Sequence, residues 1–121
     1  MKPLILLYNM NETRRSSIAM LAAYLGIRVR VVAPGEYGQT IGALCGLEGG
    51  AGGQGLWNDF SDEMLLMAFF SEALLHRFLD AFRGAGMPPV RLKAMLTETN
   101  SQWTSPQLHA ELTREEAAMR R

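Results

Sequence analysis

Two uninterrupted apolar runs constrain the fold of this chain more than any other feature of its sequence. Residues 2–8 read KPLILLY, and residues 64–70 read MLLMAFF. Neither run alternates polar with apolar side chains, so each predicts a strand that is covered on both faces. The second run has an alternative, because Met, Leu and Ala also favour helices and Ser61 could cap one long helix that reaches Arg83. We favour the strand.

Two further segments have the pattern of strands with one exposed face. Residues 27–31 read IRVRV, and residues 90–96 read VRLKAML. Such alternation is typical of a strand that buries only one face. Helical periodicity follows each of the four strands. The predicted helices begin at Asn11, Tyr37, Ser71 and Ser105, and the first is expected to end at Gly26.

The alternation of strands and helices, βαβαβαβα, predicts a single α/β domain over residues 1–121. Such an order implies a parallel sheet with right-handed crossovers. The doubly covered strands belong at the centre of the sheet and the half-exposed strands at its edges. Strand order 2-1-3-4 satisfies this condition. The expected fold is therefore a four-stranded parallel sheet, flavodoxin-like but with one strand fewer.

The composition is that of a globular protein. The 121 residues carry 12 basic and 12 acidic side chains, and 48% of them are hydrophobic. This balance argues against a disordered chain and against a strongly basic nucleic-acid binder. No segment approaches the roughly 18 apolar residues of a membrane span, and the first apolar run is too short for a signal peptide. We therefore expect a cytoplasmic protein that has no membrane contact.

Charge is segregated along the chain although it sums to zero. Residues 1–30 carry five basic and one acidic side chain, residues 31–76 carry six acidic and no basic ones, and residues 77–121 carry seven basic and five acidic ones. We expect these blocks to pair with one another inside the fold. The alternative is that they offer complementary surfaces to a protein partner or to a second copy of the chain, which would give a homo-oligomer.

One low-complexity segment interrupts the pattern. Residues 46–55 read GLEGGAGGQG, which is too rich in glycine for the interior of a helix or strand and predicts a flexible loop. A phosphate-binding loop would need a strand before the glycines and a helix directly after them. Neither is expected here, and residues 31–76 contain no lysine. A nucleotide site is therefore not predicted.

Polar side chains follow the ends of the predicted strands. In an open parallel sheet, ligands bind outside the carboxyl ends of the strands, where the strand order reverses. Amides, hydroxyls and aromatic rings are expected there, and they suit a small polar ligand: the residues are Asn9, Asn11, Tyr37, Gln39, Thr97, Thr99, Asn100 and Trp103. Trp103 would stack on a planar ligand. The alternative is that Asn11 caps a helix while Thr97 and Asn100 shape a turn.

No catalytic residue, metal site or cofactor site is predicted. The single Cys45 excludes an intramolecular disulfide, and its place on an apolar helix face favours a packed thiol. His76 and His109 stand 33 residues apart, and neither has a neighbour at metal-ligand spacing, so we expect solvated or capping roles. The acidic cluster at residues 58–63 lacks the glycine of a calcium loop, because Met64 takes its place.

Three stretches of the sequence carry a resemblance to a known family. They are LILLYNM at residues 4–10, YGQTIGALCGLEG at residues 37–49, and DEMLLM together with LKAMLTETNSQWT at residues 92–104. The chain resembles a family of small bacterial proteins that is described only as a domain of unknown function. The likeness is lost at GGAGGQGLWND. It implies a bacterial cytoplasmic origin and a strand at Met64, and it implies no activity, cofactor or site residue.

Three hypotheses for the function follow from these observations. The leading one is a non-catalytic binding or regulatory module that recognises a small polar ligand or a protein partner. The second is a small enzyme that uses the same strand-end crevice with Glu36 as its general base. The third is a structural subunit whose segregated charges drive self-assembly. The orientation of Glu36 separates the first two, because a general base must point into a pocket that Asn9 and Asn100 border.

Overall fold

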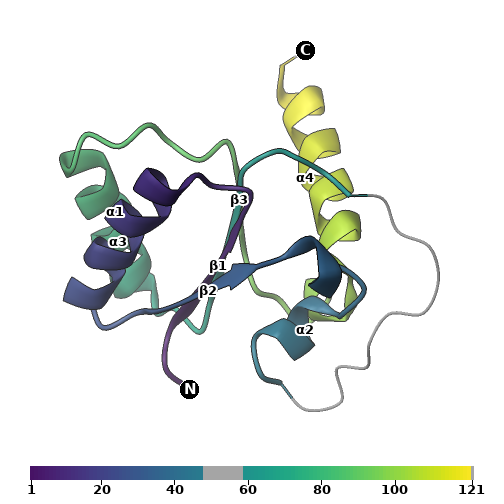
Figure 1. Ribbon diagram of the computed structural model, residues 1–121, viewed down its shortest axis with the longest axis horizontal. Helices are drawn as coiled ribbons and strands as arrows, with labels where there is room; N and C mark the ends of the chain where they lie inside the picture. The colour runs from purple at the N-terminus through teal and green to yellow at the C-terminus, as the bar shows by residue number, and fades with distance from the viewer. Residues whose placement is uncertain (48–58, 121) are drawn as a thin grey trace.

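Two strands that are buried on both faces form the centre of the molecule. The computed structural model describes residues 1–47 and 59–120, and in it β1 (Leu4–Tyr8) and β3 (Met64–Ala68) lie side by side in the middle of a four-stranded sheet (Figure 1). Every residue of both strands is buried. The prediction of two doubly covered strands is confirmed, and the alternative of one long helix over residues 61–83 is wrong.

Helices cover both faces of this sheet, and half-buried strands form its edges (Figure 1). On one face lie α1 (Glu12–Tyr24) and α3 (Glu72–Gly84), and on the other lie α2 (Ile41–Leu44) and α4 (Ser105–Met119). The edge strands are β2 (Arg28–Val32) and β4 (Leu92–Met95), which are followed by the 3-10 turns η1 (Pro34–Glu36) and η2 (Asn100–Gln102). The strand order β2-β1-β3-β4 is the predicted one.

The relative direction of the two central strands differs from the prediction. β1 pairs with β2, and β3 with β4, in parallel, but β1 and β3 are antiparallel to each other. The sheet is therefore mixed. The expectation of an entirely parallel sheet is wrong, and the flavodoxin-like assignment is not confirmed.

The connection that follows β2 differs from the connections that contain α1 and α3. A β3 parallel to β1 would require the chain to travel back along the sheet after β2. α1 and α3 make such a return, since a helix of 13 residues spans about 20 Å. α2 has only four residues and spans about 6 Å. β3 begins at the end of the sheet where β1 finishes, with Met64 opposite Tyr8.

The two halves of the chain repeat one another. Each half runs strand, helix, strand, 3-10 turn and helix, and the first strand and first helix of the second half start 60 residues after their counterparts. The backbone repeats as well. Among the described residues, Asn9 and Phe69 are the non-glycine positions with positive φ, at 59° and 64°, and Gly26 and Gly86 have φ of 74° and 73°.

The halves are paired about an approximate two-fold axis. Leu6 lies opposite Leu66 at the middle of the antiparallel pair, and the partners on either side are symmetric about it. Thr40 and Thr104, the N-caps of α2 and α4, form an isolated antiparallel bridge with each other. The fold is thus built from two similar units that share one sheet.

α2 is shorter than the helix predicted to begin at Tyr37. It starts after Thr40, whose hydroxyl oxygen accepts a hydrogen bond from the N–H of Ala43. Gly42 in α2 packs closely against η2, because a Cβ at this position would lie 2.9 Å from the carbonyl oxygen of Ser101. Most of the glycine-rich segment that follows, predicted as a flexible loop at residues 46–55, lies outside the described residues.

The long helices begin where the sequence predicts. Asn11 Oδ1 accepts a hydrogen bond from the N–H of Arg14 at 2.8 Å, and Ser71 Oγ accepts one from the N–H of Leu74 at 3.1 Å. Gly26 follows the end of α1 with a positive φ, as expected of a helix-terminating glycine. Across residues 1–47 and 59–120, no helix combines the length and the apolar character that a membrane span needs.

Candidate functional site

Among the residues predicted to form one crevice, Asn9 lies with Tyr37 and Thr97 lies with Asn100, in two separate groups. The segment that follows Gln39 contacts Trp103, whose carbonyl oxygen accepts the N–H of Ile41. Because β3 and β4 run antiparallel to β1, Asn9 leaves the sheet at one end and Thr97 leaves it at the other. The premise that the carboxyl ends of the first and last strands share an edge is therefore wrong. Asn9 and Tyr37 form the first group, with 3.4 Å between Asn9 Oδ1 and the Tyr37 hydroxyl that donates to it.

The second group surrounds Asn100, which is buried and satisfies the end of β4. Its side-chain Nδ2 donates to the carbonyl oxygen of Met95 at 2.9 Å, and its Oδ1 accepts from the N–H of Thr97 at 2.8 Å. Thr97 Oγ1 in turn accepts from the N–H of Asn100. The amide group thus occupies the hydrogen-bonding positions that a further strand would use. The alternative prediction that Thr97 and Asn100 shape a turn is confirmed.

Asn9 connects β1 to the segment that leads into β3. Its backbone is left-handed, a conformation that asparagine adopts more readily than most residues. The side-chain Nδ2 donates to the carbonyl oxygens of Phe60 at 2.8 Å and Asp62 at 3.0 Å. With Tyr37 on its oxygen, the whole amide of Asn9 is engaged within the fold, and the side-chain oxygen of Asn11 is engaged at the cap of α1.

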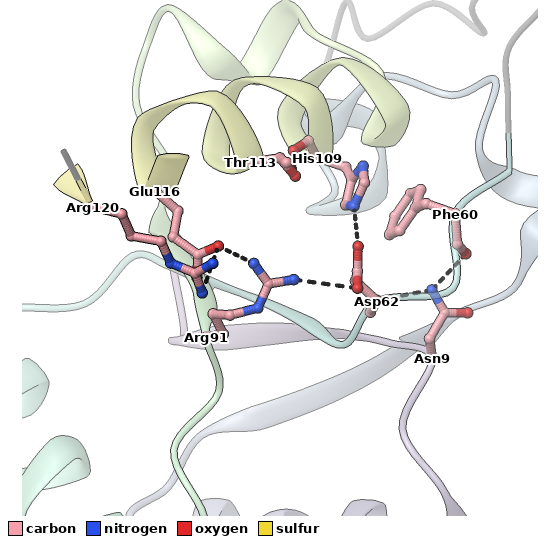
Figure 2. A network of polar contacts seen from close by, with 8 residues as sticks. All are labelled: Asn9, Phe60, Asp62, Arg91, His109, Thr113, Glu116 and Arg120. Carbon is pink, nitrogen blue, oxygen red and sulfur yellow. Dashed lines mark hydrogen bonds and ion pairs between the residues drawn. The ribbon is translucent and has the colours of Figure 1, made fainter. Parts of the chain in front are cut away.

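A polar network links the segment before β3, the segment before β4, and α4 (Figure 2). Asp62 is at its centre: Oδ2 lies 2.8 Å from His109 Nε2, and Oδ1 lies 3.2 Å from Arg91 Nη2. Arg91 also binds Glu116, which Arg120 approaches to 3.6 Å. The hydrogen bond from His109 and the charge of Arg91 hold the pKa of Asp62 below its ordinary value.

His109 is more constrained than the sequence predicts. Its side chain is 19% exposed, and its ring stacks on Phe60 with 4.3 Å between centroids. Phe60 stacks in turn on Tyr37, at 4.8 Å. For His109 the expectation of a solvated or capping role is wrong, whereas His76 is exposed on α3, as predicted. No sequence pattern signals this contact, because 47 residues separate Asp62 from His109.

The geometry of this network indicates that it holds α4 and the segments before β3 and β4 together. A histidine held by an aspartate can act as a general base, but the reaction also needs a nucleophile within hydrogen-bond reach. Within residues 1–47 and 59–120, no hydroxyl or thiol forms a hydrogen bond to the His109 ring. The hydroxyl of Ser105 is bound to Tyr8, and Cys45 is buried in the core, where desolvation raises the pKa of its thiol to about 11. The predicted packed thiol is confirmed.

Glu36 does not point into a pocket between Asn9 and Asn100. Its Oε1 accepts the N–H of Ala33 at 3.1 Å, and its Oε2 lies 2.5 Å from Arg30 Nη2. The Ala33 hydrogen bond, followed by Arg30, lowers the pKa of Glu36. A carboxylate that is engaged in this way is a weak base, which argues against the enzyme hypothesis built on it.

The segregated charges pair inside the fold, as predicted. Arg14, from the basic first block, lies with its Nε 2.9 Å from Oε2 of Glu63 in the acidic second block. Arg30 and Glu36 join the same two blocks, and the second block meets the third where Asp62 binds Arg91. The described residues contain no group of three or more Asp, Glu, His or Cys side chains that could hold a metal ion.

Apart from a concavity of about 320 Å³ between β4 and α4, lined by Arg91, Leu92, Lys93, Leu112, Glu115, Glu116, Met119 and Arg120, two concave surfaces remain after these contacts are assigned. The first, which we name the α3 pocket, is an apolar hollow of about 320 Å³ between α3 and β4, lined by Leu65, Phe78, Leu79, Phe82, Arg83, Met87, Pro89, Val90 and Lys93. The second, which we name the η2 hollow, is an open polar depression of about 550 Å³ lined by Glu98, Thr99, Gln102, Trp103 and Gln107. Gln39, also predicted at the site, is half-buried and lines neither.

Comparisons with known proteins identify one of the two repeated units. Neither the curated proteins nor the solved structures include a match to the chain. The family comparison does find one, and it covers β3, α3, β4 and α4, which form the second unit. Over residues 63–119 the chain matches the model of the DUF3783 family, a domain of unknown function, in agreement with the resemblance that the sequence suggested.

Proposed function

We propose that the protein is a non-catalytic binding module whose ligand occupies the α3 pocket. The pocket volume of about 320 Å³ lies at the lower end of the range for small-molecule sites, which runs from about 300 to 1,000 Å³. Its lining is mainly aliphatic and aromatic, with two basic side chains, and this mixture is typical of ligand pockets. The pocket also lies within the unit that matches the family model.

The observation that carries this proposal is incomplete cover over one face of β4. Lys93 is next to Leu65 in the sheet register, and Met95 is next to Met67, so both side chains are on the face that α3 packs against. Leu65 and Met67 are buried, whereas Lys93 is exposed and Met95 is 37% exposed. An apolar concavity beside an uncovered strand face is a surface where an apolar ligand can displace water favourably.

A neutral apolar probe tests this proposal. Nile red should bind the wild-type protein with a blue-shifted emission. Leu79→Trp should weaken binding about tenfold or more, because the half-buried Leu79 lines the pocket and a larger side chain would fill it. Leu75→Trp is the matched control, since Leu75 is half-buried on the same helix and is not part of the lining. Equal binding by both variants, or no binding by the wild type, would contradict the proposal.

The η2 hollow supports a second candidate, a site for a small polar ligand. Thr99 and Trp103, two residues that the sequence nominated, line it, and the ring of Trp103 is half-buried against the core with one side toward the hollow. A planar polar molecule could stack there and bind Thr99 or Gln102. In a thermal-shift screen of planar polar compounds, a stabilising compound that loses its effect in Trp103→Leu and keeps it in Asn9→Gly would support this site. Stabilisation that survives Trp103→Leu would argue against it.

A further inference from the structure

We propose that the ligand of the α3 pocket is an amphipathic anion, an apolar chain or ring with one negatively charged group, and that Lys93 binds its charge. This inference rests on the proposed function, because it names the ligand class for the same pocket. The first observation is the charge of the lining. Both ionisable residues among the lining side chains, Arg83 and Lys93, are basic, and none is acidic.

The two cations differ in whether a carboxylate already forms an ion pair with them. Arg83 Nη2 lies 2.9 Å from Asp80 Oδ1 on the same helix. Lys93 is on β4, across the pocket from α3, and within the described part of the chain no carboxylate lies within ion-pair distance of its ammonium group. Arg91, two residues before it, is held by Asp62 and Glu116. Lys93 also lines the hollow between β4 and α4 together with Glu115 and Glu116, but it forms an ion pair with neither. It is therefore the lining cation of the α3 pocket that has no ion-pair partner among the described residues.

The C-terminal end of α3 lies beside the pocket, and two carbonyl groups of its last turn are already hydrogen-bonded. α3 ends at Gly84, and the N–H groups of Ala85 and Gly86 donate to the carbonyl oxygens of Ala81 and Arg83. Unpaired carbonyls at a helix C-terminus repel an anion, and these two hydrogen bonds reduce that repulsion. The flexible lysine stem can lie along apolar surface while its ammonium group remains in water. An apolar group in the pocket and an anion at its rim would both be accommodated.

A set of compounds with the same octyl chain separates charge from apolar fit. Octanoate, octyl phosphate, 1-octanol and octylamine compete with Nile red for the wild-type protein at low and high salt. We expect both anions to bind about three- to fivefold more tightly than octanol at low salt, the scale of one exposed ion pair, and octylamine to bind least. The preference should shrink at high salt, because the charge interaction is screened.

Two matched substitutions assign this preference to one residue. The chain has only two lysines, so Lys2→Gln is the control for Lys93→Gln. Lys93→Gln should make octanoate bind like octanol, Lys93→Glu should make octylamine the better ligand, and Lys2→Gln should behave as wild type. Because Lys93 is exposed, these variants are expected to fold.

The outcomes distinguish the inference from the proposed function. If octanol displaces Nile red as well as octanoate does, or if Lys93→Glu leaves the order of ligands unchanged, the anionic ligand is ruled out and the pocket remains a binding site. If none of the four compounds displaces Nile red, or Nile red does not bind, the proposed function fails as well. Tighter binding of octyl phosphate than of octanoate would point to a phosphorylated lipid, and the reverse would point to a carboxylic acid.

Discussion

At the scale of single residues, Asn9 and Asp62 hold the segment before β3 in place. Asn9 donates to two carbonyl oxygens of that segment, and Asp62 joins it to α4 through His109. Both residues precede or follow a strand, where a sequence-based reading looks first for ligand contacts. Their polar atoms are hydrogen-bonded to other parts of the fold. We therefore expect their replacement to change the free energy of unfolding.

Replacing Asn9 tests two contributions at once. Asn9→Ala removes the hydrogen bonds to Phe60 and Asp62 and places a β-carbon without a polar group at a φ of 59°. We expect a loss of about 2 kcal/mol in the free energy of unfolding. Asn9→Gly removes the same hydrogen bonds without backbone strain and should lose less. Urea unfolding measures both, and equal losses would show that strain contributes nothing.

Asp62 makes the stability of the protein sensitive to acid. Its pKa in the folded protein lies below the ordinary value of 3.8, so folding favours the ionised carboxylate. The stabilisation is present above pH 3.8 and is lost as the pH falls through the folded-state pKa. In urea unfolding, Asp62→Asn should therefore lose less stability than wild type between pH 5 and pH 3. The pKa of Glu36 is also lowered in the folded protein, so part of the pH dependence of stability remains in both proteins. Identical losses would contradict this assignment.

At the scale of elements, the two 3-10 turns and the short helix α2 determine how the halves meet. α2 packs on η2 through Gly42, and η2 carries the asparagine that closes the outer edge of β4. These segments contain few residues in regular structure. Their geometry nevertheless decides whether the larger helices and strands can share one core.

The contact between α2 and η2 should not tolerate a side chain at Gly42. In Gly42→Ala the new Cβ would lie 2.9 Å from the Ser101 carbonyl oxygen, so the backbone must move. We expect a destabilisation of about 1 to 3 kcal/mol. Gly35→Ala is the control, because nothing lies within 4 Å of a Cβ there and its φ is not positive. Thermal unfolding of both variants checks this, and a Gly42→Ala protein as stable as the control would show that the two elements are loosely packed.

Asn100 should protect the edge strand as well as the fold. Asn100→Ala leaves the Met95 carbonyl and the Thr97 N–H without their partner, and we expect a loss of about 2 to 3 kcal/mol together with self-association. Asn11→Ala is the comparison, because it removes a helix cap at a cost of about 1 kcal/mol and leaves the edge of β4 unchanged. Light scattering at matched concentration should rise for Asn100→Ala alone. If light scattering rises for both variants, the association is caused by lost stability and not by the exposed edge of β4.

At the scale of the whole molecule, the domain is a pair of similar units joined about an approximate two-fold axis. β1 and β3 meet in the middle with symmetric partners, and the family match at residues 63–119 covers one unit. The two units differ in sequence. Where α3 has Phe78 and Phe82 beside the pocket, the positions 60 residues earlier in α1 are Ile18 and Ala22. The α3 pocket therefore distinguishes one half from the other.

The symmetric pairing predicts the behaviour of the second unit alone. A polypeptide of residues 59–120 lacks β1, so the apolar edge of β3 has no partner. A second copy of β3 can take the place of β1 in the same antiparallel register, centred on Leu66, and we expect a homodimer. Analytical ultracentrifugation would show it. The full chain under the same conditions is the control, and a folded monomer of the fragment would contradict the expectation.

The sequence by itself determined the four strands, how deeply each strand is buried, and where the long helices begin. The runs at residues 4–8 and 64–68 are doubly covered strands because they contain no polar position that could face water. The alternating segments at residues 27–31 and 90–96 form edge strands, because every second position in them is polar and can face water. Asn11, Ser71 and Gly26 mark helix ends, since their roles depend on neighbouring backbone groups. Burial of Cys45 followed from helical spacing in the same way.

Only the tertiary structure decided the direction of β3 and the partners of the polar residues. A strand buried on both faces has the same apolar pattern in a parallel and in an antiparallel pair, so periodicity carries no information about direction. That direction separates Asn9 from Thr97. The contact of Asp62 with His109, across 47 residues, depends on where α4 crosses the sheet. Local patterns record which side chains leave water, whereas the arrangement of whole elements decides which side chains they meet.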